Sequence, residues 1–161
     1  MGDSLAEMAS NFPDKNFIGV EVHTPGIGRL LSLIENNNLT NLRIFNDDAT
    51  DILNKCISAN TLSRINIFFP DPWHKNKHHK RRLIQPEFLD LIHKCLKNHG
   101  ILHIATDWEH YARHTLDLLD NYSEFSNIAG EEKFVSAKRY DRPETKFELL
   151  GKKLGHEIWD M

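Results

Sequence analysis

The sequence has only two cysteines, and it lacks the long apolar run that a membrane-spanning helix requires. Cys56 and Cys95 lie far apart and show no C-x-x-C spacing, so a disulfide framework and a thiolate zinc site are both disfavoured. No apolar stretch approaches the roughly 18 residues of a membrane span, and the chain does not open on a signal peptide pattern. We therefore expect a cytoplasmic protein with no membrane partner.

Common catalytic signatures are missing as well. The sequence contains no G-x-S-x-G, H-E-x-x-H or Walker A motif, which disfavours hydrolase, metalloprotease and P-loop functions. His74, His78 and His79 lie close together, but the lysines and arginines around them repel a metal ion. We therefore expect no metal site.

The composition is that of an ordinary globular protein without a basic excess. The 161 residues are 40% hydrophobic and 27% charged, with a formal net charge of −3. A chain of this length buries a core without disulfides or metal, so we expect a single domain over residues 1–161, as a monomer or a weak dimer. Any attraction for nucleic acid must come from a local basic patch.

Apolar runs alternate with helical patterns along the chain. We expect strands over residues 17–22, 42–45, 65–69, 101–105 and, at an edge, 156–159. Between them, helical patterns begin near Leu5, Pro25, Ala49, Pro86 and Trp108. This order predicts an α/β fold of three layers around a mostly parallel, doubly wound sheet. Gly100 is the expected left-handed residue after the helix that starts at Pro86.

The stretch 68–75, FFPDPWHK, is the feature around which the other motifs are arranged. An apolar run ends at two prolines that flank Asp71, and proline both removes a backbone donor and fixes φ. The loop should therefore hold this carboxylate at the carboxyl end of a strand, where ligands bind in open α/β sheets.

A basic run follows this loop directly, and we expect it to be a loop as well. Trp73 offers a flat face for stacking, and five cations could pair with phosphates: Lys75, Lys77, Lys80, Arg81 and Arg82. Together with Asp71 they suggest nucleic-acid chemistry. Taken alone, a basic run is more often a solvated face, and a single tryptophan is more often a packing residue.

Carboxylates recur where the expected strands end. Glu21, the pair Asp47 and Asp48, Asp71 and Asp107 each follow a strand, and parallel strands deliver such residues to one crevice. Glu21 could take both ribose hydroxyls of a nucleotide-like cofactor. By themselves, Asp48 and Asp107 could simply cap the helices that follow them.

Several motifs together resemble the bacterial tRNA (guanine-N7-)-methyltransferase family. They are VEVH at 20–23, FFPDPWHK at 68–75, KRR at 80–82, ATDWE at 105–109, RP at 142–143, TKFE at 145–148, GH at 155–156 and WD at 159–160. The resemblance covers essentially the whole chain. It implies a class I, Rossmann-like methyltransferase fold that uses S-adenosylmethionine, yields S-adenosylhomocysteine, and methylates N7 of guanine 46 in the tRNA variable loop.

The resemblance also implies a role for each matching residue. Glu21 and Asp48 correspond to acids that bind the ribose and adenine of the cofactor, and Asp71 to the catalytic aspartate, which also borders the cofactor. Substrate contacts are implied for Lys75, Asp107, Thr145, Lys146, Phe147 and Glu148, the last four in a loop. RNA contacts are implied for Lys77, His78, His79, Lys80, Arg81 and Arg82.

One departure from the family pattern leaves alternatives open. The family begins with a central strand and a glycine-rich cofactor loop, and residue 1 falls at or just after that loop, so we expect an N-terminally truncated fold. A truncated, catalytically inactive RNA-binding fragment is therefore the alternative function. A methyltransferase for protein or a small molecule is disfavoured, because it would not need basic residues beside Asp71.

Overall fold

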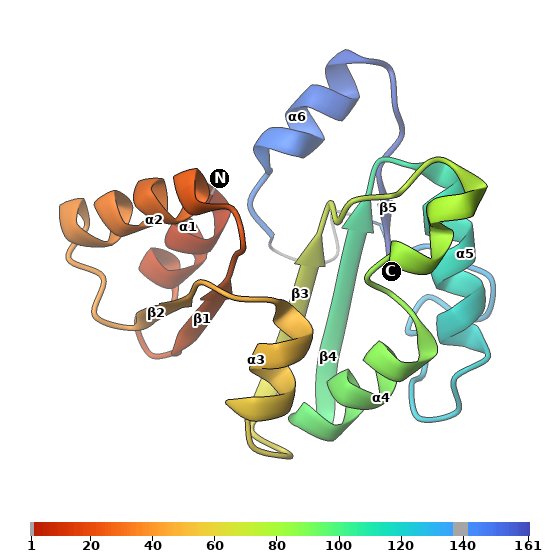
Figure 1. The fold of residues 1–161 in the computed structure, drawn as a ribbon, viewed down its shortest axis with the longest axis horizontal. Coiled ribbons are helices and arrows are strands. Elements are labelled where there is room, and N and C mark those ends of the chain that lie inside the picture. The colour runs from red at the N-terminus through yellow and green to blue at the C-terminus, as the bar shows by residue number, and fades with distance from the viewer. Residues whose placement is uncertain (1, 137–141) are drawn as a thin grey trace. The chain divides into compact units, whose positions relative to one another are not determined.

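The computed structural model describes residues 2–136 and 142–161 (Figure 1). These residues form two compact units. The first contains residues 2–56 and 142–146, and the second contains residues 57–136 and 147–161. The assembly of both units into the single expected domain stays a prediction.

The first unit is built on a parallel pair of strands, β1 (Phe17–Val20) and β2 (Leu42–Phe45). A parallel pair needs a crossover connection, and α2 (Thr24–Asn36) provides it. Two more helices, α1 (Asp3–Asn11) and α3 (Ala49–Lys55), complete the unit. The expected alternation of strand and helix is confirmed here.

Small residues let the first unit pack tightly. Its core contains Ala6 and Ala9 of α1, Leu30 of α2 and Leu42 of β2. A Cβ atom at Gly19 would lie 2.6 Å from the Leu5 side chain, so glycine at this point of β1 allows α1 to approach the strand closely.

The second unit contains the longest ladder of the molecule's described part, between β3 (Leu62–Phe68) and β4 (Leu96–Thr106). The two strands are parallel, and Phe68 lies beside Ala105. A short strand, β5 (Trp159–Asp160), pairs with β4 in the antiparallel direction. A C-terminal strand is therefore present, but the strand expected over residues 156–159 overlaps it only at Trp159. Both α4 (Pro86–Cys95) and α5 (Glu109–Asp120) pack against β4 (Figure 1).

A hydrogen-bonded series of polar side chains links β5 to β4 and β3. His103 Nε2 lies 2.7 Å from Asp160 Oδ1, and its Nδ1 lies 2.9 Å from the guanidinium of Arg64. Because a guanidinium only donates hydrogen bonds, Nδ1 accepts and Nε2–H donates to the carboxylate. His103 and Asp160 are buried, so this series satisfies polar groups that would otherwise be costly to bury.

Three local expectations were wrong. Gly100 does not end a helix, because α4 stops at Cys95 and Gly100 belongs to β4; a Cβ there would lie 2.8 Å from the Lys97 carbonyl oxygen. Residues 146–148 are not a loop but the first turn of α6 (Lys146–Lys153). The basic run forms a 3-10 helix, Asn76–Arg81. The α/β class with parallel strand pairs is confirmed, while continuity into one doubly wound sheet stays a prediction.

A surface ion pair between α1 and α2 yields a stability prediction. The side chain of Arg29 bonds to both carboxylate oxygens of Asp3, and this hydrogen bond lowers the pKa of Asp3 to about 2. A lowered pKa stabilises the fold above the ordinary value of 3.8, and this contribution disappears as the pH falls to about 2. Both side chains are half-exposed, so solvent screens the pair.

We expect Asp3→Asn to lower the free energy of unfolding by about 0.5–1 kcal/mol at pH 7 and low salt. Urea denaturation followed by circular dichroism measures this loss, which should shrink between pH 4 and pH 2 and at high salt. Glu7→Gln on the same helix is the control. Equal stability of Asp3→Asn and wild type at pH 7 and low salt would contradict the prediction.

Candidate functional site

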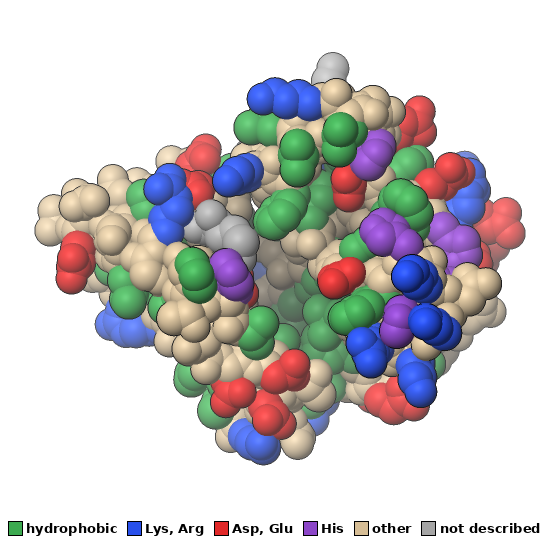
Figure 2. Space-filling model, turned by 45° about the horizontal axis from the view of Figure 1, so that its top comes forward, with side chains coloured by type: hydrophobic (Ala, Val, Ile, Leu, Met, Phe, Trp, Pro, Cys, Tyr) green, Lys and Arg blue, Asp and Glu red, His purple; other side chains and the backbone are tan. Residues whose placement is uncertain are grey.

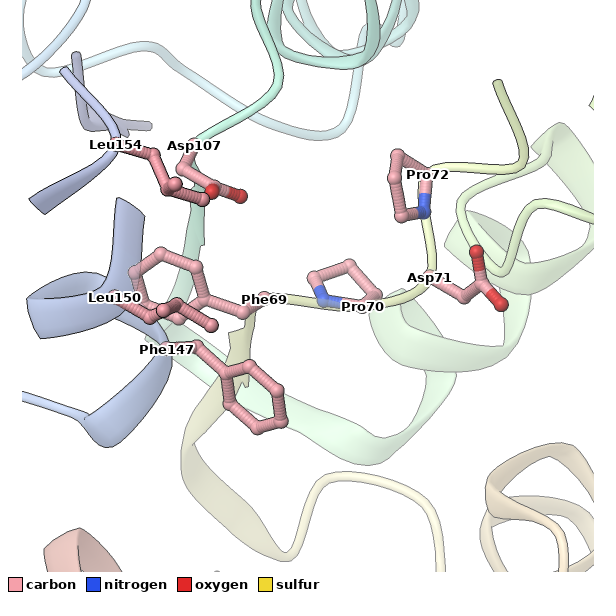
Figure 3. A pocket seen from close by; sticks show the side chains of 8 residues that line it. All are labelled: Phe69, Pro70, Asp71, Pro72, Asp107, Phe147, Leu150 and Leu154. Atoms are coloured by element: carbon pink, nitrogen blue, oxygen red, sulfur yellow. The ribbon is translucent and has the colours of Figure 1, made fainter. Parts of the chain in front are cut away.

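A pocket of about 350 Å³ lies in the second unit where β3 and β4 end (Figure 3). Its lining comes from the loop after β3, the residue after β4, and α6 with its C-terminal extension. The lining residues are Phe69, Pro70, Asp71, Pro72, Asp107, Phe147, Leu150 and Leu154. The expectation that Asp71 and Asp107 share one crevice is confirmed.

The loop after β3 is held in a strained conformation. Phe69 and Trp73, which bracket the Pro-Asp-Pro segment, both adopt left-handed backbone angles, with φ of 54° and 45°. Bulky residues rarely adopt such angles, which cost of order 1–3 kcal/mol each and cluster at functional sites. The backbone N–H of Phe69 donates to the Ala105 carbonyl at 2.7 Å, so the loop starts from a fixed point on β4.

Asp71 is exposed on this loop. Its Oδ1 accepts a hydrogen bond from the backbone N–H of Trp73 at 3.0 Å, which fixes the carboxylate by a local turn. In Figure 3 its carboxylate lies on the far side of Pro70 from the rings of Phe69 and Phe147. Asp71 therefore borders the pocket across Pro70 from the aromatic rings.

Asp107 is held from two directions. Its Oδ2 lies 3.0 Å from Nδ1 of His156, and its side chain packs against Gly151 of α6, where an added Cβ would lie 2.8 Å from Oδ2 and 3.1 Å from the Asp107 Cβ. Glycine at position 151 thus leaves room for the carboxylate. Motif analysis did not identify Gly151 as a site residue, and it noted His156 only as part of a family motif.

The rest of the pocket lining is mostly apolar. The rings of Phe69 and Phe147 are stacked, with centroids 6.4 Å apart and an interplanar angle of 24°. Leu150 and Leu154 line the same pocket with side chains that are 53% and 64% exposed. Flat aromatic faces beside carboxylates suit a planar base with hydrogen-bond donors on its edge.

The other predicted acids lie in the first unit. Glu21 directly follows β1, and its Oε1 accepts from the backbone N–H of His23 at 2.8 Å. Asp48 caps α3, with Oδ1 accepting from the Thr50 N–H at 2.8 Å. Since β1 and β2 are parallel neighbours, Glu21 and Asp48 leave the same edge of their sheet. Their grouping with Asp71 and Asp107 stays a prediction.

The basic run presents a cationic surface with one exception. Lys75, Lys77, Lys80 and Arg81 are exposed, His78 and His79 are half-buried, and Arg82 is buried at 2% exposure. Arg81 lies over the Trp73 ring at 5.1 Å from its centroid. Figure 2 shows Lys, Arg and His side chains gathered near this part of the surface. Arg82 differs from the rest of the run, because its guanidinium bonds to Pro72 and lies beside His110 within the second unit; an RNA contact for Arg82 stays a prediction.

The four predicted substrate contacts at residues 145–148 do not all lie at the pocket. Phe147 lines the pocket, whereas Glu148 is buried at 5% exposure and pairs with Lys152, one helical turn away, at 2.8 Å. Thr145 and Lys146 belong to the first unit. Of these four residues, the structure brings only Phe147 to the pocket with Asp71 and Asp107.

Within residues 2–136 and 142–161, no helix is long and apolar enough to cross a membrane. In the same ranges, no three His, Cys, Asp or Glu side chains are grouped as metal ligands would be.

Comparison with known proteins places the chain in a family. The profile of the family described as "Putative methyltransferase" matches residues 1–161. The chain is 55% identical to the tRNA (guanine-N(7)-)-methyltransferase of Alcanivorax borkumensis over all 161 residues, and 52% identical to that of Marinobacter nauticus, covering 67% of each relative. It is 50% identical to the tRNA (guanine-N(7)-)-methyltransferase of Pseudomonas fluorescens, of which it covers 66%.

The chain thus spans about two thirds of the length of these relatives while matching them along its entire sequence. Identity of this extent, together with a family profile that covers every residue, goes far beyond a shared fold. The chain belongs to the bacterial tRNA (guanine-N7-)-methyltransferase family.

Proposed function

We propose that this chain binds tRNA and transfers a methyl group from S-adenosylmethionine to N7 of guanine 46 in the variable loop. The observation that carries the proposal is the pocket that Asp71 and Asp107 share with Phe69 and Phe147, in a chain that belongs to this family. A volume of about 350 Å³ is at the lower end of small-ligand sites. It suits a single base better than an extended ligand.

The chemistry explains why no general base is needed. Guanine N7 carries a lone pair and no proton, so no proton has to leave before the new bond forms. When bound, S-adenosylmethionine supplies the methyl group: the N7 lone pair forms the N–C bond while the C–S bond breaks, leaving S-adenosylhomocysteine. The enzyme's main contribution is then alignment of the reacting atoms.

The two pocket carboxylates have distinct roles in this proposal. Guanine becomes positively charged as N7 is methylated, so a nearby carboxylate is worth more in the transition state than in the ground state. We assign this role to Asp71. Asp107, which His156 and Gly151 hold in place, accepts hydrogen bonds from the N–H groups on the edge of guanine.

The first unit contains the residues that would hold the cofactor. A carboxylate can accept hydrogen bonds from both hydroxyls of a ribose, and Glu21 is a partly exposed carboxylate of which one oxygen is engaged by His23. We assign the ribose to Glu21 and the adenine side to Asp48. Asp48 also serves as a helix cap, so its replacement would affect both α3 and cofactor binding.

The proposal leaves the basic 3-10 helix to bind phosphates. Lys77, Lys80 and Arg81 are exposed cations, and contacts with phosphate position a nucleic acid without selecting a base. Lys75 lies between them and the pocket in sequence. We assign the selection of guanine to the pocket and most of the affinity for tRNA to this surface.

We expect Asp71→Asn to lower the rate of methyl transfer to tRNA by roughly 100-fold. Asparagine retains an oxygen that can accept from the Trp73 N–H, so the loop stays in place while the charge is lost. Transfer of labelled methyl groups to N7 of guanine measures the rate. Asp117→Asn, on the exposed surface of α5, is the control.

A wild-type rate for Asp71→Asn would remove the role assigned to this residue. Binding of tRNA by the wild-type chain without any methyl transfer would contradict the proposed activity and favour the inactive RNA-binding alternative. Calorimetric titration with S-adenosylmethionine then identifies whether cofactor binding is the missing step.

We expect Gly151→Ala to lower methyl transfer by roughly 10- to 100-fold, because the new Cβ must displace the Asp107 carboxylate. The substitution normally favours a helix by up to about 1 kcal/mol, so folding should not suffer. Gly28→Ala on α2, where nothing lies within 4 Å of the added Cβ, is the control. It should keep full activity, and an active Gly151→Ala variant would count against the role of Asp107.

We expect the double substitution Lys80→Ala, Arg81→Ala to weaken tRNA binding and to flatten its salt dependence. Each lost phosphate contact should reduce the slope of log K against log salt by roughly 0.7–0.9. Filter binding or fluorescence anisotropy across a salt series measures the slope. Lys97→Ala, at the opposite end of β4 from Asp107, should leave it unchanged; an unchanged slope in the double variant would remove the surface from the RNA interface.

A further inference from the structure

Arg82 is the buried member of an otherwise exposed basic run. It directly follows the 3-10 helix, and only 2% of its surface is exposed, whereas its neighbour Arg81 is exposed. Within the described part of the chain, no carboxylate lies within ion-pair distance of its guanidinium. A buried cation without a counter-charge is expensive to maintain, so its position calls for an explanation other than RNA binding.

The contacts of the guanidinium connect three segments of the second unit. Its Nε donates to the carbonyl oxygen of Pro72 at 2.9 Å. One terminal nitrogen lies 3.2 Å from Nδ1 of His110, which must accept because a guanidinium only donates. The central carbon lies over the ring of Tyr111, 4.9 Å from its centroid. Arg82 thus joins the loop after β3 to the first turn of α5.

Pro72 is the point at which a hydrogen bond best fixes the backbone beside Asp71. It lies between Asp71 and Trp73, and Trp73 has the left-handed φ of 45°. Neither Pro70 nor Pro72 has a backbone N–H to donate, so the backbone of the segment can be held only through its carbonyl groups and the single N–H of Asp71. The bond from Arg82 supplies such a link, ten residues away in the sequence.

The remaining features of Arg82 fit a role in geometry better than one in stability. Its NH1 is buried and has no hydrogen-bond partner within the described residues, and a buried donor without a partner destabilises the folded state. Its charge is also felt by nearby histidines: burial lowers the pKa of His114, and the charge of Arg82 lowers it further. The site therefore accepts an unfavourable environment to keep a forked donor in this place.

From these contacts we infer that Arg82 is a positioning residue, which holds the Pro70–Pro72 loop and with it Asp71 at the pocket, and that it does not bind RNA. The inference about catalysis rests on the proposed function, whereas the inference about the loop does not. Arg81 and Arg82 are adjacent and chemically identical, so each serves as the matched control for the other.

The first experiment measures how strongly the backbone amides of the loop are protected from hydrogen exchange, and it needs no activity assay. Hydrogen exchange of backbone amides, followed by NMR, is compared among wild type, Arg82→Lys and Arg81→Lys. Lysine keeps the charge but cannot contact Pro72, His110 and Tyr111 at once. We expect Arg82→Lys to speed exchange at least tenfold at Trp73, whose N–H donates to Asp71, with no change at the β4 amides 102–105, and Arg81→Lys to leave both regions unchanged.

The second experiment separates positioning from RNA binding. Removing the charge in Arg81→Gln should reduce the salt slope of tRNA binding by roughly one phosphate contact, whereas Arg82→Gln should leave the slope unchanged. We expect Arg82→Lys to lower kcat about tenfold with KM for tRNA within twofold of wild type. If Arg82→Gln does not fold, Arg82→Lys alone provides the exchange and kinetic comparisons.

Three outcomes would overturn the inference. One is wild-type exchange at Trp73 in Arg82→Lys. Another is an equal rise in exchange at the loop and at β4, which would make Arg82 a general structural residue. The third is a loss of salt slope in Arg82→Gln that matches that in Arg81→Gln. Absence of methyl transfer by the wild-type chain would instead count against the proposed function, and the exchange comparison would still decide the role of Arg82.

Discussion

The parallel pairing of β3 with β4 is the interaction on which the candidate site depends. It sets Phe68 beside Ala105, and the bond from the Phe69 N–H to the Ala105 carbonyl extends the pairing to the first residue of the loop. Asp71 and Asp107 therefore leave the sheet at one edge. A shift of this register would move Asp71 relative to Asp107 even if every helix kept its place, so the ladder aligns the two carboxylates.

Energetically unfavourable features, namely strained backbone angles and a buried charge, are concentrated at the site beside this ladder. The left-handed angles of Phe69 and Trp73 and the buried charge of Arg82 all lie on or beside the same loop. Such strain persists only where the surrounding structure over-determines the conformation. Here the sheet fixes one end of the loop and Arg82 fixes its middle. By contrast, the polar chain at β5, through His103 and Asp160, is fully buried and satisfied.

The sequence predicted the framework because strands and helices depend on local pattern. The strand at 42–45 and the helix that begins at Pro86 appear as expected, and the acids after β3 and β4 share a pocket because parallel strands leave a sheet at one edge. Contacts between residues that are distant in the sequence could not be predicted from local pattern. The pattern of a C-terminal glycine favoured Gly100 as a helix end, but its backbone approaches the Lys97 carbonyl within β4.

The same limit applied to individual side chains. The sequence KRR does not distinguish the environments of Arg81 and Arg82. In the structure Arg81, the last residue of the 3-10 helix, is exposed, and Arg82, which follows it, is buried. Gly151 belongs to none of the motifs that the sequence offers, and its role follows only from the 2.8 Å separation between an added Cβ and Asp107. Environment, rather than residue type, assigns these roles.

These features fit the chemical demands of methylation at N7. A reaction without proton removal offers little scope for acid–base catalysis, so its rate depends on how well the reacting atoms are aligned. A strained loop fixed at two points and an aspartate held by His156 and Gly151 are means of keeping such alignment. Exposed cations attract RNA of any sequence, and selection of the base then falls to the rigid pocket. Arg81 and Arg82 show the same separation of roles in two neighbouring residues: in our proposals Arg81 binds phosphate, and Arg82 positions the loop that carries Asp71.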